Sequence, residues 1–264
     1  MLIPQPPLEM LVDKTAELYI TAALGTIAVA ALIYSLIHWA RSGRPVMLLL
    51  FIGGGSMMVF EPMVDTVGAC WFPSNSWVGF EAYGRPLPVW LCLAYFFYFG
   101  IASALVWMNL KKGRTRAQIW IAFVAAMIGD LLFESALLTV DPYTYYGHQP
   151  LWLPNGFPLW WMAVNALIPF VLGAIVHAFD DYFRGWRSLA IVPVSLTTSA
   201  AVNASIGWPS WLVINTEYSW MLTQLGGVAT FVLAFAIIKL MCHFVARDAR
   251  TGLPAARSTR VASA

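Results

Sequence analysis

The chain has 264 residues, of which 60% are apolar and only 11% are charged, and its mean hydropathy is +0.71. Soluble domains carry about a quarter charged residues, so this composition excludes an ordinary soluble protein and indicates an integral membrane protein. The net charge of +2 gives no reason to expect a nucleic-acid partner. The three cysteines have the spacing of neither a metal-binding box nor a disulfide framework.

Seven apolar segments, each long enough to cross a bilayer, follow one another along the chain. They lie at about 19–39, 46–64, 87–109, 118–140, 158–179, 188–207 and 219–242. We therefore expect an all-α integral membrane protein, a bundle of seven transmembrane helices. Residues 1–245 are expected to form a single membrane domain, and residues 246–264 a flexible, basic cytoplasmic tail.

The basic residues predict how the bundle is oriented. Thirteen of the 15 lie after odd-numbered spans or at the inner end of the last one: Arg41, Arg44, Lys111, Lys112, Arg114, Arg116, Arg184, Arg187, Lys239, Arg247, Arg250, Arg257 and Arg260. The positive-inside rule then places the N-terminus outside and the C-terminus in the cytoplasm. The alanine- and arginine-rich tail is typical of a high-GC bacterium, so a bacterial cell membrane is the expected location.

Three carboxylic acids fall inside the predicted spans, where charged groups are costly and usually mark a functional site. Glu61 lies 15 residues into the second span and Glu134 lies 16 residues into the fourth. Both spans run outward, so a rise of about 1.5 Å per residue puts both acids roughly 22–24 Å from the inner edge. Asp130 lies one turn deeper than Glu134 on the same helix face.

Other polar residues are predicted to reach the same outer layer. Asn165 in the fifth span and Asn203 near the outer end of the sixth add amides to it. Asp65 follows Glu61 by one turn, and Glu217 precedes the seventh span. Several helices would thus deliver polar groups to one outward-facing site.

These acids also have ordinary structural interpretations. Glu61 would serve as a helix cap near the interface, followed by Pro62. Glu134 and Asp130 would bond neighbouring helices together, as polar groups in membranes do. Asp65 would be a solvated loop acid.

Aromatic residues make up 15% of the chain and are concentrated in the predicted outer loops. Interfacial belts of tryptophan and tyrosine account for part of this. The remainder would suit the lining of a pocket beside the acids, because aromatic faces stabilise cations. We select Trp71, Tyr146, Trp161 and Trp220 as lining residues, together with the two asparagines.

Two hairpins share a sequence pattern. The first reads "VFEPMVDTVGACWFP … YGRPLPVW" and the second "LFESALLTVDPYTYYG … NGFPLWW". Each places Phe-Glu late in an outward span, then a loop rich in glycine, proline and aromatic residues, then Pro-Leu shortly before tryptophan. The pattern suggests one span followed by three related hairpins, although proline and glycine are also common in unrelated loops.

A carboxylic acid in an apolar chamber favours its neutral form, which can protonate an alkene or epoxide as a general acid. The resulting carbocation needs aromatic faces and exclusion of water. The chain resembles the small seven-span membrane-bound terpene cyclases of fungal meroterpenoid pathways and their bacterial counterparts, in size, span count and the glutamate of "VFEPMVD". The resemblance implies that Glu61 protonates an isoprenoid or prenylated lipophilic substrate. The late aspartate of that family has no clean match, so Glu134 takes its place on depth.

We therefore expect a proton-initiated terpene cyclase in which Glu61 and Glu134 are the main acids. Asp65, Asp130 and Glu217 would tune or orient them. No cofactor or metal is expected, because "DDYFR" at 180–184 lacks the last acid of a metal-binding DDxxD motif and is predicted to be cytoplasmic. Besides the substrate, membrane lipid is the only partner expected.

Three alternatives remain open. A carotenoid-type cyclase or another isoprenoid-modifying enzyme would use the same acids. A small-molecule or proton-coupled transporter would use Asp130 and Glu134. A non-enzymatic membrane scaffold would use the aromatic loops as a partner surface.

Overall fold

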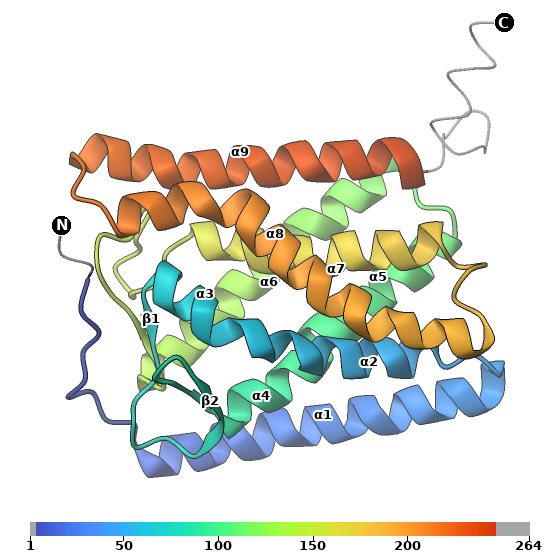
Figure 1. The fold of residues 1–264 in the computed structure, drawn as a ribbon, viewed down its shortest axis with the longest axis horizontal. Helices are drawn as coiled ribbons and strands as arrows, with labels where there is room; N and C mark the ends of the chain where they lie inside the picture. Colours follow the sequence, from blue (N-terminus) through green and yellow to red (C-terminus); the bar gives the residue numbers. More distant parts are fainter. Residues whose placement is uncertain (1–3, 247–264) are drawn as a thin grey trace, which may run out of the picture.

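The computed structural model describes residues 4–246. Within them, seven helices are long and apolar enough to cross a membrane: Lys14–Ser42, Val46–Gly68, Val89–Lys111, Arg116–Val140, Trp160–Ala178, Gly185–Ile214 and Trp220–Val245. The helices pack side by side as a bundle (Figure 1), which confirms the predicted all-α architecture. The predicted basic tail lies outside the described residues, apart from Ala246.

Several spans are assembled from shorter helical pieces. In chain order, the pieces are α1 (Lys14–Ser42), α2 (Val46–Ser56), the 3-10 turn η1 (Met57–Phe60), α3 (Glu61–Gly68), α4 (Val89–Tyr95), the π-helical η2 (Phe96–Ile101), α5 (Ala102–Lys111), α6 (Arg116–Leu137), η3 (Leu138–Val140), α7 (Trp160–Ala178), η4 (Gly185–Ala190), α8 (Ile191–Ile214) and α9 (Trp220–Val245). The second and third spans therefore each contain an interruption in regular α-helix.

The sixth span is longer than its predicted range of 188–207. Helix α8 continues to Ile214 with Pro209 inside it, so Trp208 and Trp211 belong to a helix and not to an outer loop. A proline is tolerated within a membrane helix when neighbouring groups satisfy the freed backbone atoms. At the end of α8, the Asn215 side chain donates hydrogen bonds to the backbone oxygens of Trp211 and Val67.

Four short strands lie at one end of the bundle, called here the strand end (Figure 1). Strand β1 (Cys70–Trp71) pairs antiparallel with β4 (Thr144–Tyr145), with Cys70 opposite Tyr145. Strand β2 (Val78–Ala82) pairs with β3 (Arg85–Pro88). Because β1 follows α3 and β4 follows α6, the first ladder ties together the ends of the second and fourth spans.

The second and third spans approach so closely that only glycine fits between them. A Cβ added to Gly54 of α2 would lie 2.4 Å from the backbone nitrogen of Gly100 in η2, and one added to Gly100 would lie 2.6 Å from the Leu50 oxygen. Small residues let helix backbones approach in this way in membranes. The contact brings the region of Glu61 up against the region of Tyr95.

Candidate functional site

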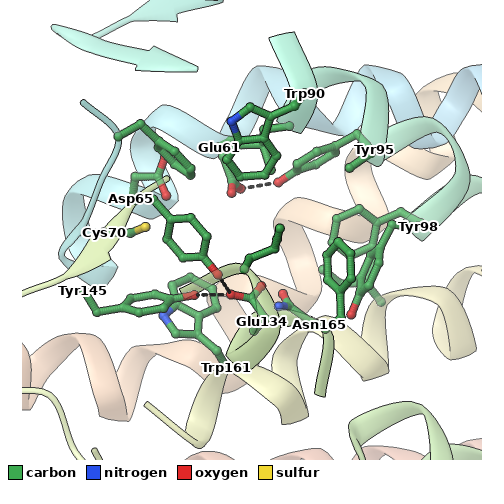
Figure 2. Close-up of a pocket in the computed structure, with 18 of the residues that line it drawn as sticks. Glu61, Asp65, Cys70, Trp90, Tyr95, Tyr98, Glu134, Tyr145, Trp161 and Asn165 are labelled. Atoms are coloured by element: carbon green, nitrogen blue, oxygen red, sulfur yellow. Dashed lines mark hydrogen bonds between the residues drawn. The ribbon is translucent and has the colours of Figure 1, made fainter. Parts of the chain in front are cut away.

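A cavity of about 70 Å³ lies inside the bundle toward the strand end. It is called here the acid chamber, because three carboxylic acids line it: Glu61, Asp65 and Glu134. Nine aromatic side chains share the lining: Phe72, Trp90, Tyr95, Tyr98, Phe99, Phe133, Tyr143, Tyr145 and Trp161. Figure 2 shows Glu61 and Glu134 on opposite sides of this space.

Glu61 stands where the second span changes its helical form. Pro62 follows it and has no backbone N–H, so the α-helical hydrogen-bond pattern is interrupted there. The chain passes through η1 and starts α3 at Glu61. The Tyr95 hydroxyl donates to Oε2 of Glu61 (Figure 2). No hydrogen bond to Oε1 is formed by any residue between 4 and 246, so this oxygen is available to a ligand.

Glu134 is held in a similar way from the opposite side. Its Oε2 accepts hydrogen bonds from the hydroxyls of Tyr143 and Tyr145, the second at 3.1 Å (Figure 2). Burial raises the pKa of both tyrosines and the Glu134 carboxyl raises it further, so they remain protonated donors. Within the described part of the chain, Oε1 of Glu134 has no hydrogen-bond donor.

Asp65 is the third acid of the chamber, and its expected position in a solvated loop is wrong. Helix α3 continues to Gly68, which leaves Asp65 inside the helix and only 2% exposed. Glu61 lies one turn away on the same helix, as the sequence predicted. Cys70 lies beside Asp65 (Figure 2), and burial together with the nearby Asp65 carboxyl raises the pKa of its thiol.

A buried guanidinium lies close to Asp65. Arg85 of β3 is 9% exposed and donates to the Cys70 backbone oxygen at 2.8 Å and to the Tyr146 hydroxyl at 2.7 Å. It also lies over the rings of Trp71 at 5.2 Å and Tyr146 at 5.8 Å. Trp71 and Tyr146 therefore hold Arg85 in place and do not line the chamber, which corrects their predicted role.

Four further polar atoms of the chamber residues are completely buried and have no hydrogen-bond partner among residues 4–246. They are Oδ2 of Asp65, Oδ1 of Asn203 and the indole Nε1 atoms of Trp90 and Trp161. All four side chains are more than nine-tenths buried. Buried polar groups are almost always hydrogen-bonded in folded proteins, so two donors and two acceptors around one cavity indicate a site that receives a polar group.

Asp130 bonds to neighbouring helices behind the wall of the acid chamber. It accepts hydrogen bonds from the Tyr98 hydroxyl and from Nδ2 of Asn165, the latter at 3.3 and 3.5 Å from its two oxygens. Tyr98 and Asn165 line the acid chamber, but Asp130 lies behind them. It therefore orients chamber residues without lining the chamber itself.

The structure gathers six of the predicted residues around one cavity: Glu61, Asp65, Glu134, Trp161, Asn165 and Asn203. Glu217 and Trp220 are not among them and are exposed, Trp220 to 77%. Trp220 opens α9, with Ser219 as its cap, so both residues lie at the rim of the bundle. Their assignment to the site is corrected for this reason.

Sequence reasoning missed the tyrosines of the third span. Tyr95 and Tyr98 hold the carboxyls of Glu61 and Asp130. A buried tyrosine hydroxyl usually needs a hydrogen-bond partner. Two tyrosines within an apolar span were therefore a signal that the in-span carboxyls had partners there.

Within residues 4–246, no group of three or more histidine, cysteine, aspartate or glutamate side chains is arranged to hold a metal ion. Comparisons with protein-family models, curated proteins and solved structures give no match. A functional assignment therefore depends on the geometry and chemistry of the acid chamber.

Proposed function

We propose that the protein is a membrane-bound terpene cyclase that protonates an isoprenoid alkene or epoxide with a buried carboxylic acid. The supporting observation is that Glu61 and Glu134, from separate spans, face one small aromatic-lined chamber. Each has one carboxyl oxygen held by tyrosine and the other open. This arrangement fixes the direction in which a proton would be delivered.

In the proposed first step, neutral Glu61 transfers the proton on Oε1 to a carbon of the alkene or to the epoxide oxygen. A new C–H or O–H bond forms, the positive charge moves to carbon, and Glu61 becomes a carboxylate. The hydrogen bond from Tyr95 strengthens as this charge develops, which stabilises the transition state. A second alkene of the chain attacks the cation and closes the ring, and Glu134 or Asp65 takes up the proton released at the end.

The aromatic lining would carry the cationic intermediate. Phe72 packs against Trp90 at 5.9 Å and against Tyr143 at 5.4 Å between ring centroids, so these rings support one another. A cation over an aromatic face gains about 0.5–2 kcal/mol per ring, most where water is excluded. The unpaired polar atoms of Trp90, Trp161, Asn203 and Asp65 would bind an oxygen-bearing group of the substrate.

The proposal includes the orientation predicted from the basic residues, with the N-terminus outside and the C-terminus in the cytoplasm. With the basic residues in the cytoplasm, the chamber lies in the outer half of a bacterial cell membrane, accessible to lipophilic substrates. The three-hairpin repeat would then place the two Phe-Glu pairs at corresponding positions.

The alternatives fit the observations less well. A carotenoid-type cyclase would use the same groups and differ only in its product. A transporter needs a polar path across the bundle, but fully buried apolar side chains such as Met47, Leu50 and Leu172 fill the interior beyond the chamber. A scaffold has no need for four unpaired polar atoms around an internal cavity.

The test is the substitution Glu61→Gln, which keeps the size of the side chain but removes its acidic proton. We expect cells that express the wild-type chain to convert a prenylated precursor, from a panel of such compounds, into a cyclised lipid. General acid catalysis contributes about 10²–10⁴-fold, so Glu61→Gln should lower product formation by that amount while the precursor accumulates.

The matched control is Glu81→Gln, because Glu81 is an exposed glutamate of β2 at the same end of the bundle. It should retain wild-type product levels. Product formation that survives Glu61→Gln, or the absence of any cyclised product from a folded wild-type protein, would contradict the proposal.

A further inference from the structure

A second, larger cavity lies next to the acid chamber. It has a volume of about 600 Å³ and is bounded by side chains of α1, of η2 and the start of α5, of α6 and of α7. It is called here the lateral groove. Most of its lining is apolar, for example Ile27 of α1, Phe97 of η2 and Ala126 of α6. Apart from the Tyr34 hydroxyl, the few polar side chains of its lining, Tyr98, Asp130 and Asn165, lie where it approaches the chamber.

The groove and the chamber share two residues. Tyr98 and Asn165 line both cavities, and Asp130 lines the groove while accepting hydrogen bonds from both of them. The three side chains form the only polar part of the groove wall apart from the Tyr34 hydroxyl, among the lining residues that the structure describes. Tyr98 belongs to η2, and π-helical turns occur frequently at functional sites.

The volume of the chamber shows that it cannot enclose a whole isoprenoid. A cavity measured in this way needs about 10–15 Å³ for each water-sized group. The chamber, at about 70 Å³, therefore holds about five such groups, or roughly the carbons of one isoprene unit. A chain that closes a ring needs at least two units, so most of it must lie in an adjoining apolar space.

We propose that the lateral groove is the binding site for the isoprenoid chain of the substrate. The chain enters from the bilayer between α1 and α6 and passes Tyr98 and Asn165, so that its reacting end reaches the acid chamber. This inference rests on the proposed cyclase function and adds the position and entry route of the substrate. An apolar chain moves from lipid into an apolar groove at little cost, because neither environment offers it hydrogen bonds to lose.

Gly129 of α6 offers a direct way to close the groove. It lines the groove, and a Cβ added there would meet no atom within 4 Å. A large side chain at this position therefore projects into open space without displacing the helix. Gly129→Trp should fill the groove and leave the acid chamber intact. Ile128→Trp is the matched control, because Ile128 is the preceding residue of α6, is 51% exposed and does not line the groove.

The experiment uses the full chain in phosphatidylcholine nanodiscs and a farnesyl-type prenyl alcohol that carries a diazirine on the isoprene unit next to the hydroxyl, away from the terminal alkene that would be protonated. Photolysis should label peptides of α1 and α6 in the wild-type protein and in Ile128→Trp. Labelling should fall at least tenfold in Gly129→Trp, and unlabelled prenyl alcohol should compete with it. Glu61→Gln should be labelled like the wild type although it makes no product.

The outcomes separate this inference from the proposed function. Equal labelling of Gly129→Trp and the wild type would overturn the groove assignment. So would labelling that resists competition by the prenyl alcohol and is matched by a diazirine phospholipid, because the groove would then hold ordinary lipid. Labelling as expected in a protein that forms no cyclised product would support the groove while removing the proposed reaction.

Discussion

The carboxylates of the acid chamber have different hydrogen-bond and ion-pair partners from Asp180, which forms a second acidic site at the opposite end of the bundle. Asp180 Oδ2 lies 2.8 Å from an Arg44 nitrogen and 3.3 Å from Nζ of Lys111, and its Oδ1 accepts from Nε1 of Trp107 at 2.9 Å. Both of its oxygens are therefore bonded, two of the three donors being cations. In the chamber, Glu61 and Glu134 have hydroxyl donors on one oxygen only.

Under the proposed function, this difference separates a structural acid from one that takes part in the reaction. Partial burial alone would raise the pKa of Asp180, but hydrogen bonds from Arg44 and Trp107 and the charges of Arg44 and Lys111 outweigh it and lower the pKa to about 2. Asp180, in the loop after α7, is thus an anion that joins this loop to the turn before α2 and to the end of α5. Glu61 and Glu134 each have an open oxygen and tyrosine partners, which suits proton exchange with a ligand.

Among the variants that test this comparison between the acid chamber and the Asp180 site, Glu134→Gln is expected to have the largest effect on product formation. As the second acid, Glu134 should contribute about 10²-fold to product formation, the lower end of the range for general acid–base groups. The melting temperature should stay the same or rise slightly, because a neutral amide avoids the cost of a carboxyl in the membrane. Product yield and thermal unfolding in detergent measure the two effects. A yield within twofold of wild type would show that Glu134 takes no part in turnover.

Asp180→Asn should do the reverse of Glu134→Gln: it should lower the stability of the fold and leave product formation unchanged. Removing the anion leaves Arg44 and Lys111 without a partner and should lower the free energy of unfolding by about 1 kcal/mol, the upper value for partly exposed ion pairs. Product formation per folded molecule should stay within twofold. Asp181→Asn is the matched control, because the Asp181 side chain is 95% exposed and, among residues 4–246, its one ion pair is with Arg184 three residues away. If Asp180→Asn lowered turnover and not stability, the two acidic sites would not be distinct in role.

The pH dependence of this stabilisation follows from the lowered pKa of Asp180. An unfolded aspartate has a pKa of about 3.9, so the native contribution is complete above that value and is lost as pH falls through about 2. The stability difference between wild type and Asp180→Asn should shrink between about pH 4 and pH 2. Unfolding of both proteins across that range measures it, and a constant difference would exclude Asp180 as its source.

The smallest effect is expected at Glu217 and Trp220, which lie outside the chamber and are exposed. Glu217→Gln and Trp220→Phe should leave product formation within twofold of wild type, because neither side chain reaches the chamber lining. Measurement of cyclised lipid from both variants tests this. A larger loss from either one would place the site nearer the rim than the cavity indicates.

The sequence by itself determined the seven apolar helices and predicted that Glu61 and Glu134 lie at one level, and both line the same cavity. The two predictions follow from short-range physics: a run of apolar residues must leave water, and the helical rise converts residue number into depth. The same reasoning named Asp65 as a candidate but ended the second span at residue 64, because the end of α3 depends on packing at the strand end. It also could not tell the buried Trp161 from the exposed Trp220, since composition does not record which way a helix is turned.

Only the tertiary structure decided which groups meet. The β1–β4 ladder joins the second span to the fourth, and the contact of Gly54 with Gly100 brings Tyr95 to Glu61. These are contacts between residues distant in the chain, so they fix the rotation of each helix about its axis and the paths of its loops. The depth of a side chain is local information, whereas its direction depends on the whole bundle.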